Sequence, residues 1–355
     1  EDVERAVAQV ARGLASLRAP SRSTPAAAAW GGAQERSLHV ALFCRTSLAG
    51  ALAAMATFRA GEGVVLVPVN WRWTPTEAVR ALRGTVAPMP PPGERTKRLV
   101  VLCDADCREL AEEVSGRLWD SCAGGYVLEA LGGGGKSGRA ALRVDPILFG
   151  SAAVDWREEE RREGGHSGAW LGEAPLDAVA AVLFTSGTTS RRPKGARLTR
   201  RAFLLQAEAK AERIGYSRSD AHVHCAPLHH VSGLCALATA LHSSRAGRHC
   251  FVPRFSPASF LTAVDAFFPS EESVHSEDRV CILAVPAMLR QISAHLNTND
   301  FSGERRGMRQ VGIGLLGGDA VDEPVAAMCE SLFPNARLYC TYGMTEACSS
   351  IAIAP

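Results

Sequence analysis

The chain has 355 residues, of which 46% are hydrophobic and 21% are charged, and its formal net charge is +2. This length is sufficient for two or three α/β units with a sizeable core, and the apolar content excludes disorder of the whole chain. The near balance of 39 basic and 37 acidic residues excludes the strongly basic surface of a dedicated nucleic-acid-binding protein. We therefore expect a globular protein that has no nucleic-acid partner.

Eleven cysteines are scattered along the chain, most of them within apolar runs such as 280–283. Free thiols in such runs behave as small core side chains, so we expect a reducing compartment. No apolar run approaches the length of about 20 residues that a transmembrane helix needs, and no signal peptide begins the chain. The chain opens within a predicted helix at 3–17, so we expect that it is cut from a longer protein and that any targeting segment is missing.

Strand and helix signals alternate in the first third of the chain. Short apolar runs predict buried strands, and the segments between them carry apolar residues at helical spacing. The strands are predicted at 39–43, 64–69 and 99–102, and the helices at 48–60, 74–82 and 107–118. This alternation predicts a mainly parallel sheet that is covered by helices.

The composition changes after this region, where four glycines at 132–135 and a charged run at 157–162 follow one another. We expect a long surface excursion there, partly disordered. Regular alternation resumes with the apolar strand 179–184. The predicted organisation is a first α/β subdomain at 1–123, a Gly-rich and charged insertion or linker at 124–176, and a second α/β subdomain at 177–355.

Residues Gly135, Lys136 and Ser137 resemble the end of a phosphate-binding P-loop. That motif needs a glycine five residues before Gly135, where this chain has Ala130, and it needs a helix afterwards, where 139–144 predicts a strand. We interpret the segment as low-complexity sequence.

A cluster of potential metal ligands comprises His222, His224, Cys225, His229 and His230. No second ligand pair follows at the regular spacing of a zinc site. A structural zinc protein is therefore only a distant alternative.

A hydroxyl-rich turn, 185–195, follows the predicted strand 180–184. It contains five hydroxyl side chains, two glycines and Lys194. Hydroxyls and backbone N–H groups suit phosphate oxygens, and a lysine adds compact positive charge. Composition alone would favour an ordinary Ser/Thr-rich loop, so the order of the residues has to decide between the loop and a phosphate site.

This order resembles the phosphate-binding segment of the adenylate-forming (AMP-binding) enzymes, which include acyl-CoA synthetases, luciferases and peptide-synthetase adenylation domains. Three further segments follow in the order of that family. They are 227–234, which resembles its histidine motif, 316–320, which resembles the Gly-Gly turn along the adenine, and 342–346, which resembles the Tyr-Gly-x-Thr-Glu motif near the α-phosphate. Residues 70–73 and 285–289 also look like family landmarks.

The resemblance implies the large N-terminal domain of the adenylate-forming fold, α/β in class, with two helix-covered, mainly parallel sheets. The family's small C-terminal domain, with its adenylation lysine, and its ribose-binding aspartate would lie beyond Pro355. We therefore expect this chain alone to bind substrates better than it turns them over, with little or no adenylation. Segments 69–77 and 342–350 look most like the o-succinylbenzoate–CoA ligases of plants and algae.

The activity that the resemblance implies is an AMP-forming acid–CoA ligase, with ATP, Mg²⁺ and CoA as cofactor or co-substrates. The acid would be 2-succinylbenzoate, in phylloquinone or menaquinone biosynthesis, and the location would be a chloroplast or peroxisome. Two alternatives stay open. One is a fatty-acid or 4-coumarate-type CoA ligase, and the other is a catalytically inactive nucleotide-binding homologue.

The resemblance also implies roles for individual residues, with Lys194, Thr345, Glu346 and His230 as the catalytic ones. An ordinary core histidine is the alternative for His230. The residues that would hold the β- and γ-phosphates are Thr185, Ser186, Gly187, Thr188, Thr189 and Lys194. Those that would contact the adenine and the α-phosphate are Gly317, Gly318, Asp319, Tyr342 and Thr345. The acid would contact His230, Ser232, Gly233 and Gly343, and Mg²⁺ would bind to Glu346.

One departure from the family pattern lies in the phosphate segment. The usual order is Thr-Thr-Gly, one residue, then Pro-Lys-Gly, whereas Ser190, Arg191 and Arg192 fill this gap here, one residue longer and without the glycine. If that glycine serves a turn with positive φ, a side chain there costs about 1–2 kcal/mol of strain. This departure keeps the inactive homologue as an alternative.

Overall fold

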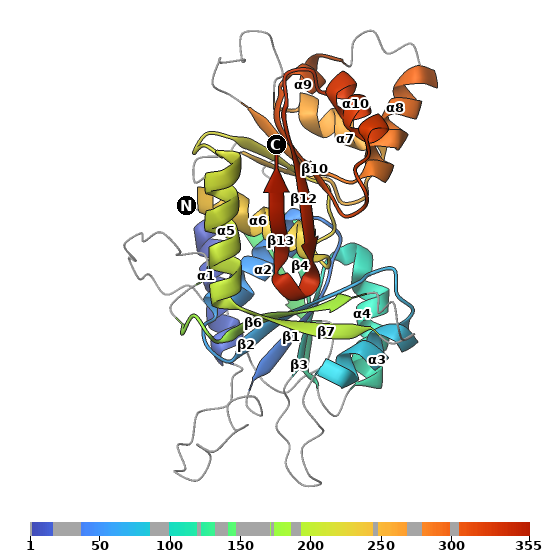
Figure 1. The fold of residues 1–355 in the computed structure, drawn as a ribbon. Coiled ribbons are helices and arrows are strands. Elements are labelled where there is room, and N and C mark those ends of the chain that lie inside the picture. The colour runs from blue at the N-terminus through green and yellow to red at the C-terminus, as the bar shows by residue number, and fades with distance from the viewer. Residues whose placement is uncertain are drawn as a thin grey trace. The chain divides into compact units, whose positions relative to one another are not determined.

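The computed structural model describes residues 2–16, 37–85, 99–118, 122–131, 141–146, 171, 174–185, 193–243, 248–267, 279–298 and 305–355. The chain forms two compact units, 1–201 and 202–355. Each unit is built on one sheet (Figure 1). The segments 132–137 and 157–162, for which low-complexity sequence and a surface excursion were predicted, lie outside the described residues.

The first unit contains a seven-stranded sheet in the order β5-β4-β3-β1-β2-β6-β7. Five of these strands run parallel, and the edge strands β5 and β7 are antiparallel to their neighbours. Every residue of β1, β2 and β3 is buried, which explains why these strands are apolar except for His39. The bounds are β1 Leu38–Phe43, β2 Val64–Val69, β3 Leu99–Cys103, β4 Cys122–Leu131, β5 Ala141–Pro146, β6 Val179–Thr185 and β7 Lys194–Thr199.

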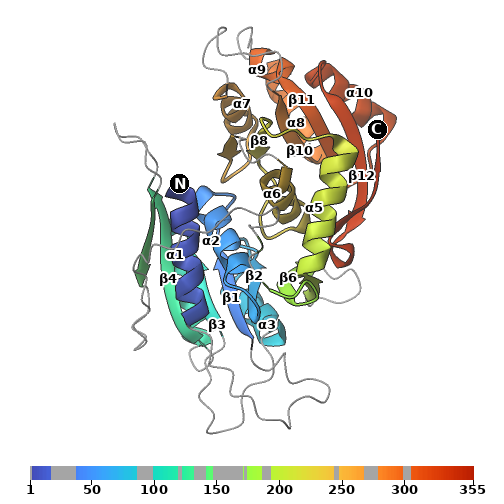
Figure 2. The same cartoon turned by 90° about the vertical axis from the view of Figure 1, so that its left-hand side faces the viewer.

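Helices cover both faces of this sheet, with α1 and α2 on one side (Figure 2) and α3 and α4 on the other. The helix starts follow local sequence rules. Ser47 caps α2 by accepting a hydrogen bond from the Gly50 N–H at 3.1 Å. Thr74 and Glu77 form a capping box at the start of α3, where Pro75 is the first helical residue. The bounds are α1 Asp2–Ser16, α2 Leu48–Arg59, α3 Pro75–Thr85, the 3-10 helix Ala105–Cys107 and α4 Arg108–Arg117.

The division between the units differs from the predicted boundary at 176/177. The strand β6 pairs in parallel with β2, at Leu66 and Ala181, so β6 and β7 complete the first sheet instead of opening the second unit. The predicted surface excursion also contains β4 and β5. The predicted insertion begins at Gly124, but Gly124 and Gly125 pair with Val100 and Val101 of β3, which sequence spacing could not reveal.

The second unit contains a six-stranded sheet in the order β13-β12-β11-β10-β8-β9, parallel except for β13. The strands are β8 Ala221–His224, β9 His249–Phe251, β10 Val280–Ala284, β11 Val311–Gly317, β12 Arg337–Met344 and β13 Ser349–Ala354. The helices are α5 Arg200–Ile214, α6 Val231–Ser243, α7 Pro257–Asp265, α8 Pro286–Thr298, α9 Arg305–Arg309, α10 Glu323–Leu332 and the 3-10 helix η7 Thr345–Ala347.

Alternate residues of this sheet enter two hydrophobic clusters, as the two faces of a strand require. Val280 and Ile282 of β10 pack in a cluster that includes residues of α7, α8 and α10. Cys281 faces the opposite way and packs with Ile214 of α5 and Tyr339 of β12. The architecture confirms the predicted fold class, two helix-covered and mainly parallel sheets. Across the described helices, no stretch is both long and apolar enough to cross a membrane.

Candidate active site

The site residues predicted in the second unit follow neighbouring parallel strands. β8, β10, β11 and β12 run in the same direction, so their carboxyl ends meet at one edge of the sheet. The histidine segment follows β8, the Gly-Gly turn ends β11, and the 342–346 segment ends β12. Open α/β sheets bind ligands at this edge. The fold therefore brings three sequence-distant segments together.

The Gly-Gly turn requires both of its glycines. A Cβ on Gly317 would lie 2.5 Å from the Thr341 methyl carbon and 2.7 Å from the Thr341 carbonyl oxygen, so β11 and β12 approach closely here. Gly318 has φ +83°, a conformation that side chains disfavour. Gly318 and Asp319 are exposed, and the Asp319 carboxylate accepts a hydrogen bond from the Ala320 N–H at 2.8 Å. The turn thus presents accessible backbone beside β12.

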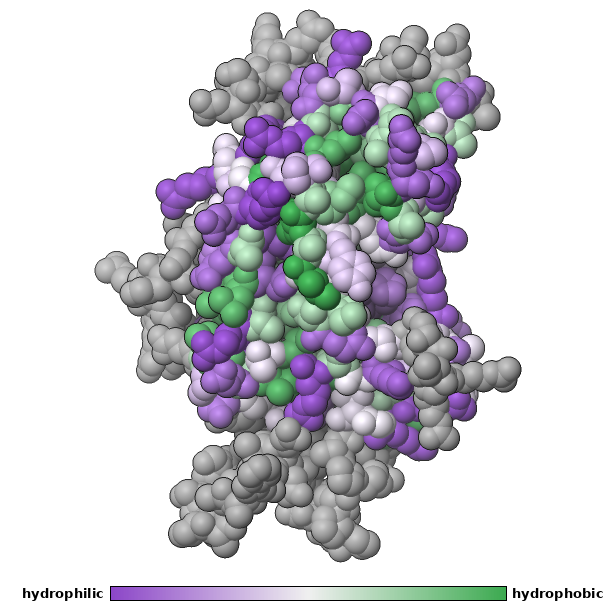
Figure 3. Space-filling model, in the orientation of Figure 1, coloured by the Kyte–Doolittle hydropathy of each residue, from purple (hydrophilic) through white to green (hydrophobic). Residues whose placement is uncertain are grey.

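The 342–346 segment forms the tip of the β12–β13 hairpin. The register shifts between Tyr342 and Gly343, and a Cβ on Gly343 would lie only 1.9 Å from the Ser349 carbonyl oxygen. Glycine is therefore the one residue that fits at this bulge. Tyr342 is 66% exposed, and Glu346 on η7 is also exposed. Figure 3 views the face on which the hairpin lies, where apolar side chains show among hydrophilic ones.

The turn after η7 has an unusual backbone. Cys348 has φ +57° and Ser349 has φ +100°, and neither residue is glycine. Such conformations cost about 1–3 kcal/mol each and persist where the surroundings hold them. They lie directly after Thr345 and Glu346, so the strained turn belongs to the candidate site.

Helix α5 holds this turn through side chains that the sequence did not single out. Gln206 donates from its amide nitrogen to the Ser350 carbonyl at 2.6 Å and accepts from the Ser350 N–H at 3.2 Å. Lys210, one turn later, donates to the Ser349 hydroxyl at 2.9 Å, and Arg213 donates to the Ile353 carbonyl at 3.2 Å. The i, i+4, i+7 spacing of these three residues places them on one face of a helix. From the sequence alone, such a polar face is equally expected to contact solvent.

The histidine segment leads into α6. The His230 N–H donates to the Pro227 carbonyl at 3.0 Å, and a Cβ on Gly233 would lie 2.2 Å from that same carbonyl oxygen. Glycine at 233 therefore lets α6 start against the preceding loop. His230 is exposed and Ser232 is partly buried, so His230 is not the core histidine that the alternative proposed. The neighbouring His229 is buried, with its ring 4.4 Å from that of His230.

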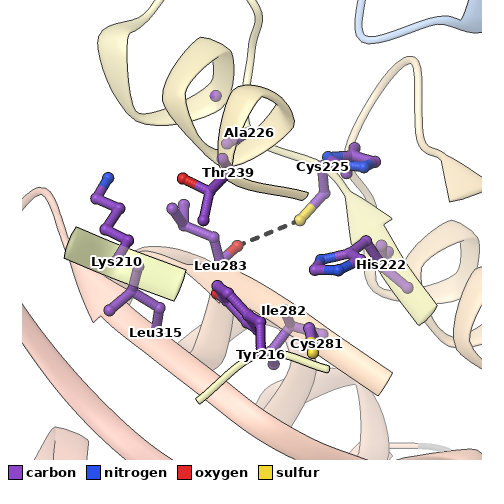
Figure 4. Close-up of a pocket in the computed structure, with 14 residues that line it drawn as sticks. Lys210, Tyr216, His222, Cys225, Ala226, Thr239, Cys281, Ile282, Leu283 and Leu315 are labelled. Atoms are coloured by element: carbon purple, nitrogen blue, oxygen red, sulfur yellow. Dashed lines mark hydrogen bonds between the residues drawn. The ribbon is translucent and has the colours of Figure 1, made fainter. Parts of the chain in front are cut away.

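A small cavity lies between α5, α6, β8 and β10 (Figure 4). Its open space, about 20 Å³ for the centre of a water molecule, is sufficient for one water. Lys210 and Leu315 lie at one end, and His222 and Cys225 at the other, where the Cys225 thiol donates to the Leu283 carbonyl at 3.5 Å. Gly233 also lines this cavity, so the cavity borders the first turn of α6.

Three histidines near this cavity stack on one another. The ring centroids of His224 and His249 are 5.3 Å apart, and His224 Nε2 lies 3.0 Å from His249 Nδ1. Burial lowers the pKa of His222 to about 3 and that of His249 to about 4, and it also lowers the pKa of His224. The rings are therefore neutral at pH 7. No group of three or more potential ligands within the described ranges could hold a metal ion.

In the first unit, the structure describes the two ends of the hydroxyl-rich turn. Thr185 ends β6, Lys194 begins β7, and the two residues pair across the antiparallel ladder. Lys194 is exposed. Trp73, in the landmark at 70–73, packs against Phe184 with ring centroids 5.4 Å apart. Ser186, Gly187, Thr188 and Thr189, with the departure at 190–192, lie outside the described residues.

The Mg²⁺ that the resemblance implies needs hard oxygen ligands. Glu346 presents an exposed carboxylate on η7, and Thr345, which is partly buried, precedes it with a hydroxyl. These oxygen donors fit Mg²⁺ when phosphate oxygens and water complete the coordination.

A sequence profile described as AMP-binding enzyme matches residues 128–355.

Curated relatives match about half of the chain. A 2-succinylbenzoate–CoA ligase, chloroplastic/peroxisomal, of Arabidopsis thaliana is 33% identical over 183 residues, which are 52% of this chain and 29% of the relative. A malonate–CoA ligase of Arabidopsis thaliana is 29% identical over 175 residues, 48% of this chain and 28% of the relative. A 2-succinylbenzoate–CoA ligase of Bacillus subtilis is 30% identical over 178 residues, 50% of this chain and 32% of the relative. The matched segments thus span about a third of these relatives.

Solved structures share the fold along nearly the whole chain. The O-succinylbenzoate coenzyme A synthetase MenE of Bacillus subtilis, in complex with AMP, has a TM-score of 0.60 at 20% identity, covering 99% of this chain and 68% of that one. Apo MatB of Rhodopseudomonas palustris has a TM-score of 0.61 at 19% identity, covering 98% of this chain and 55% of that one.

Proposed function

The chain belongs to the AMP-binding enzyme family, and from this premise we propose that it forms the substrate-binding part of an ATP-dependent acid–CoA ligase. The observation that carries the proposal is the convergence of three segments at one sheet edge. Gly317 to Asp319 and Tyr342 to Glu346 end adjacent parallel strands, and His230 follows a third strand of the same sheet. This arrangement suits a nucleotide beside an acid.

We infer that the acid is 2-succinylbenzoate, activated for phylloquinone or menaquinone biosynthesis. Similarity to 2-succinylbenzoate–CoA ligases from a plant and from Bacillus supports this substrate, and the plant relative supports a chloroplast or peroxisome as the location. A malonate–CoA ligase is a second candidate, because a relative of that description is similar over nearly the same share of the chain.

The reaction has to convert a carboxylate, a poor acyl donor, into an activated acyl group. Attack of a carboxylate oxygen on the α-phosphorus of ATP forms the acyl-adenylate and releases pyrophosphate. Attack of the CoA thiol on the acyl carbon then releases AMP. Both steps gain from positioning of the reactants and from stabilisation of the charge on the phosphates.

The chain's own residues have defined tasks in this proposal. The exposed backbone at Gly318 and Asp319 and the ring of Tyr342 would hold the adenine, and the Thr345 hydroxyl would donate to the α-phosphate. Thr185, Lys194 and the hydroxyl-rich residues between them would hold the β- and γ-phosphates. Glu346 would bind the Mg²⁺, which supplies positive charge to the phosphates. His230, Ser232, Gly233 and Gly343 would line the acid's position.

The experiment is thermal unfolding with non-hydrolysable acyl-adenylate mimics that carry 2-succinylbenzoyl, malonyl, decanoyl or coumaroyl groups. A mimic at about 100 times its dissociation constant stabilises the folded chain by about 2.7 kcal/mol. The proposal predicts the largest stabilisation from the 2-succinylbenzoyl mimic. Equal shifts from all four would retain the family chemistry and reject this acid, and a larger malonyl shift would favour the second candidate.

Two variants make this test site-specific. Tyr342→Ala removes an exposed ring from the proposed adenine site, so it should reduce the shift without lowering the stability of the free chain. Ile351→Ala removes an exposed apolar side chain from the same hairpin and should leave the shift intact. If no mimic stabilises the wild-type chain, the proposed function is contradicted and the chain has no working nucleotide site.

A further inference from the structure

Two thiols that the proposed reaction does not use lie in contact in the second unit. Cys235 is on α6 and Cys348 follows η7, 113 positions later in the chain, yet their sulfur atoms are 3.8 Å apart. A disulfide has an S–S length of about 2.05 Å, so the sulfurs need to approach by less than about 2 Å. Contact between residues so distant in sequence arises only from the fold.

The surroundings of the pair favour reactivity. Lys210 is 2% exposed, and its ammonium donates to the hydroxyl of Ser349, the residue next to Cys348. The hydrogen bond from the Cys348 thiol and the positive charge of Lys210 lower the pKa of Cys235, against the opposing effect of burial. A thiolate is the nucleophilic form of cysteine, and a buried ammonium is a suitable neighbour for it.

We propose that Cys235 and Cys348 form an oxidation site that a small hydroperoxide converts into an internal disulfide. The Cys235 thiolate attacks one peroxide oxygen; the S–O bond forms, the O–O bond breaks, and the leaving oxygen takes up a proton as water or an alcohol. The Cys348 sulfur then attacks the sulfur of the resulting sulfenic acid, the S–S bond forms, and water leaves with the Cys348 proton. The two thiols lose two electrons, and the peroxide gains them.

The burial of both sulfur atoms limits the size of the oxidant that can reach them. Cys235 is 1% exposed and Cys348 is 2% exposed, so a disulfide of the size of oxidised glutathione does not reach either sulfur in the folded chain. A small hydroperoxide needs a smaller local opening of the folded chain than a disulfide of that size does. The oxidation sequence from thiolate to sulfenic acid to disulfide is reversible by thiols.

The disulfide would connect α6 to the turn that follows Thr345 and Glu346. It would therefore fix the position of two segments of the candidate site relative to each other. Formation of the bond does not depend on the proposed function, whereas any effect on ligand binding does. A measurement of the disulfide therefore tests this proposal without testing the proposed function.

The test treats the full chain with increasing hydrogen peroxide, blocks the remaining thiols, and maps the linked peptides by mass spectrometry without reduction. Cys225 lies in the same tryptic peptide as Cys235, and Cys340 in the same peptide as Cys348, so fragmentation must assign the linked positions. The expected result is the loss of two hydrogen masses, a Cys235–Cys348 link as the first product, and its reversal by dithiothreitol.

Four variants provide the controls. Cys235→Ala and Cys348→Ala should each abolish the link, while Cys225→Ala and Cys340→Ala, from the same two peptides, should retain it. The proposal is overturned if Cys235 and Cys348 of the wild-type chain remain free while other thiols oxidise, or if oxidised glutathione forms the link as fast as peroxide does. The wild-type peptide map decides the matter even if a variant folds poorly.

Discussion

Lys210 and Ser349, 139 positions apart, are joined by a hydrogen bond of 2.9 Å between the ammonium and the hydroxyl. The lysine is buried on α5, and the serine has φ +100° in the turn that follows η7. This bond and the two that Gln206 makes with Ser350 hold the backbone beside Thr345 and Glu346. Helix α5 is therefore part of the structure that positions the candidate site, although no ligand contact is assigned to it.

Replacement of Gln206 by leucine tests this positioning. Gln206→Leu leaves the Ser350 N–H and C=O without their side-chain partners, so the free energy of unfolding should fall by about 1–3 kcal/mol. Urea unfolding measures the change. Glu208→Leu, an exposed position on the same helix, should change stability by less than about 0.5 kcal/mol. Equal effects of the two variants would contradict a specific role for Gln206.

Gly343→Ala tests the close approach at the hairpin tip. The new Cβ would lie 1.9 Å from the Ser349 carbonyl oxygen, so the backbone must move and stability should fall by about 1–3 kcal/mol. The matched control is Gly116→Ala on α4, where nothing lies within 4 Å of the added carbon. That change should stabilise the chain by up to about 1 kcal/mol, since alanine favours a helix. A neutral Gly343→Ala variant would show that the tip has a different backbone.

The ion pair between Asp220 and Arg279 tests the contribution of burial. Asp220 is fully buried, and both of its carboxylate oxygens accept hydrogen bonds from Arg279 at 2.9 Å. Asp220→Asn removes the charge that balances Arg279, so stability should fall by about 3 kcal/mol. Asp177→Asn breaks a similar two-bond pair with Arg201 on an exposed surface and should have a much smaller effect. Similar losses in chemical denaturation would contradict this reasoning.

The buried histidines predict a loss of stability in acid. Burial, and then the charge of His249, lower the pKa of His222 to about 3, although Asp220 opposes the shift. The unfolded chain takes up this proton near pH 6.5, so it binds more protons than the folded chain below that value. The stability that neutral His222 provides is therefore fully present above about pH 6.5 and is lost as the pH falls towards about 3.

Urea unfolding between about pH 7 and pH 5, above the range of ordinary carboxylates, measures this effect. Each such histidine adds a slope that approaches about 1.4 kcal/mol per pH unit. His222→Phe keeps an aromatic ring beside Tyr216, but this ring cannot be protonated. The variant should therefore reduce the slope of stability against pH by the contribution of one histidine. An unchanged slope would mean that His222 accepts a proton in the folded chain.

Local sequence rules predicted most of the elements because their causes are local. The runs at 64–69 and 99–102 are apolar throughout, the run at 39–43 is apolar apart from His39, and the strands that contain them are buried on both faces. Pairing between distant strands has no such local cause. Gly124 and Gly125 belong to the predicted insertion, whereas their ladder with β3 makes them part of a strand, and β6 joins the first sheet through its contact with β2.

Some residues of the candidate site could also be predicted from the sequence, whereas others could not. The resemblance to the family motifs led to the prediction of Gly317, Gly318, Tyr342 and Glu346, which lie at one edge of the second sheet. Gln206 and Lys210 could not be predicted, because a polar side chain on a helix usually faces solvent. Only the folded chain shows that these two residues contact β13.

Hydrogen–deuterium exchange of the full chain, with and without the 2-succinylbenzoyl-adenylate mimic at a concentration that saturates the thermal shift, locates the ligand site. Binding at the carboxyl edge of the second sheet predicts slower exchange of the amides at 317–319 and 342–346, with little change in α4, on the other unit. Protection confined to other segments, or none at saturation, would contradict the assignment of the site to this edge.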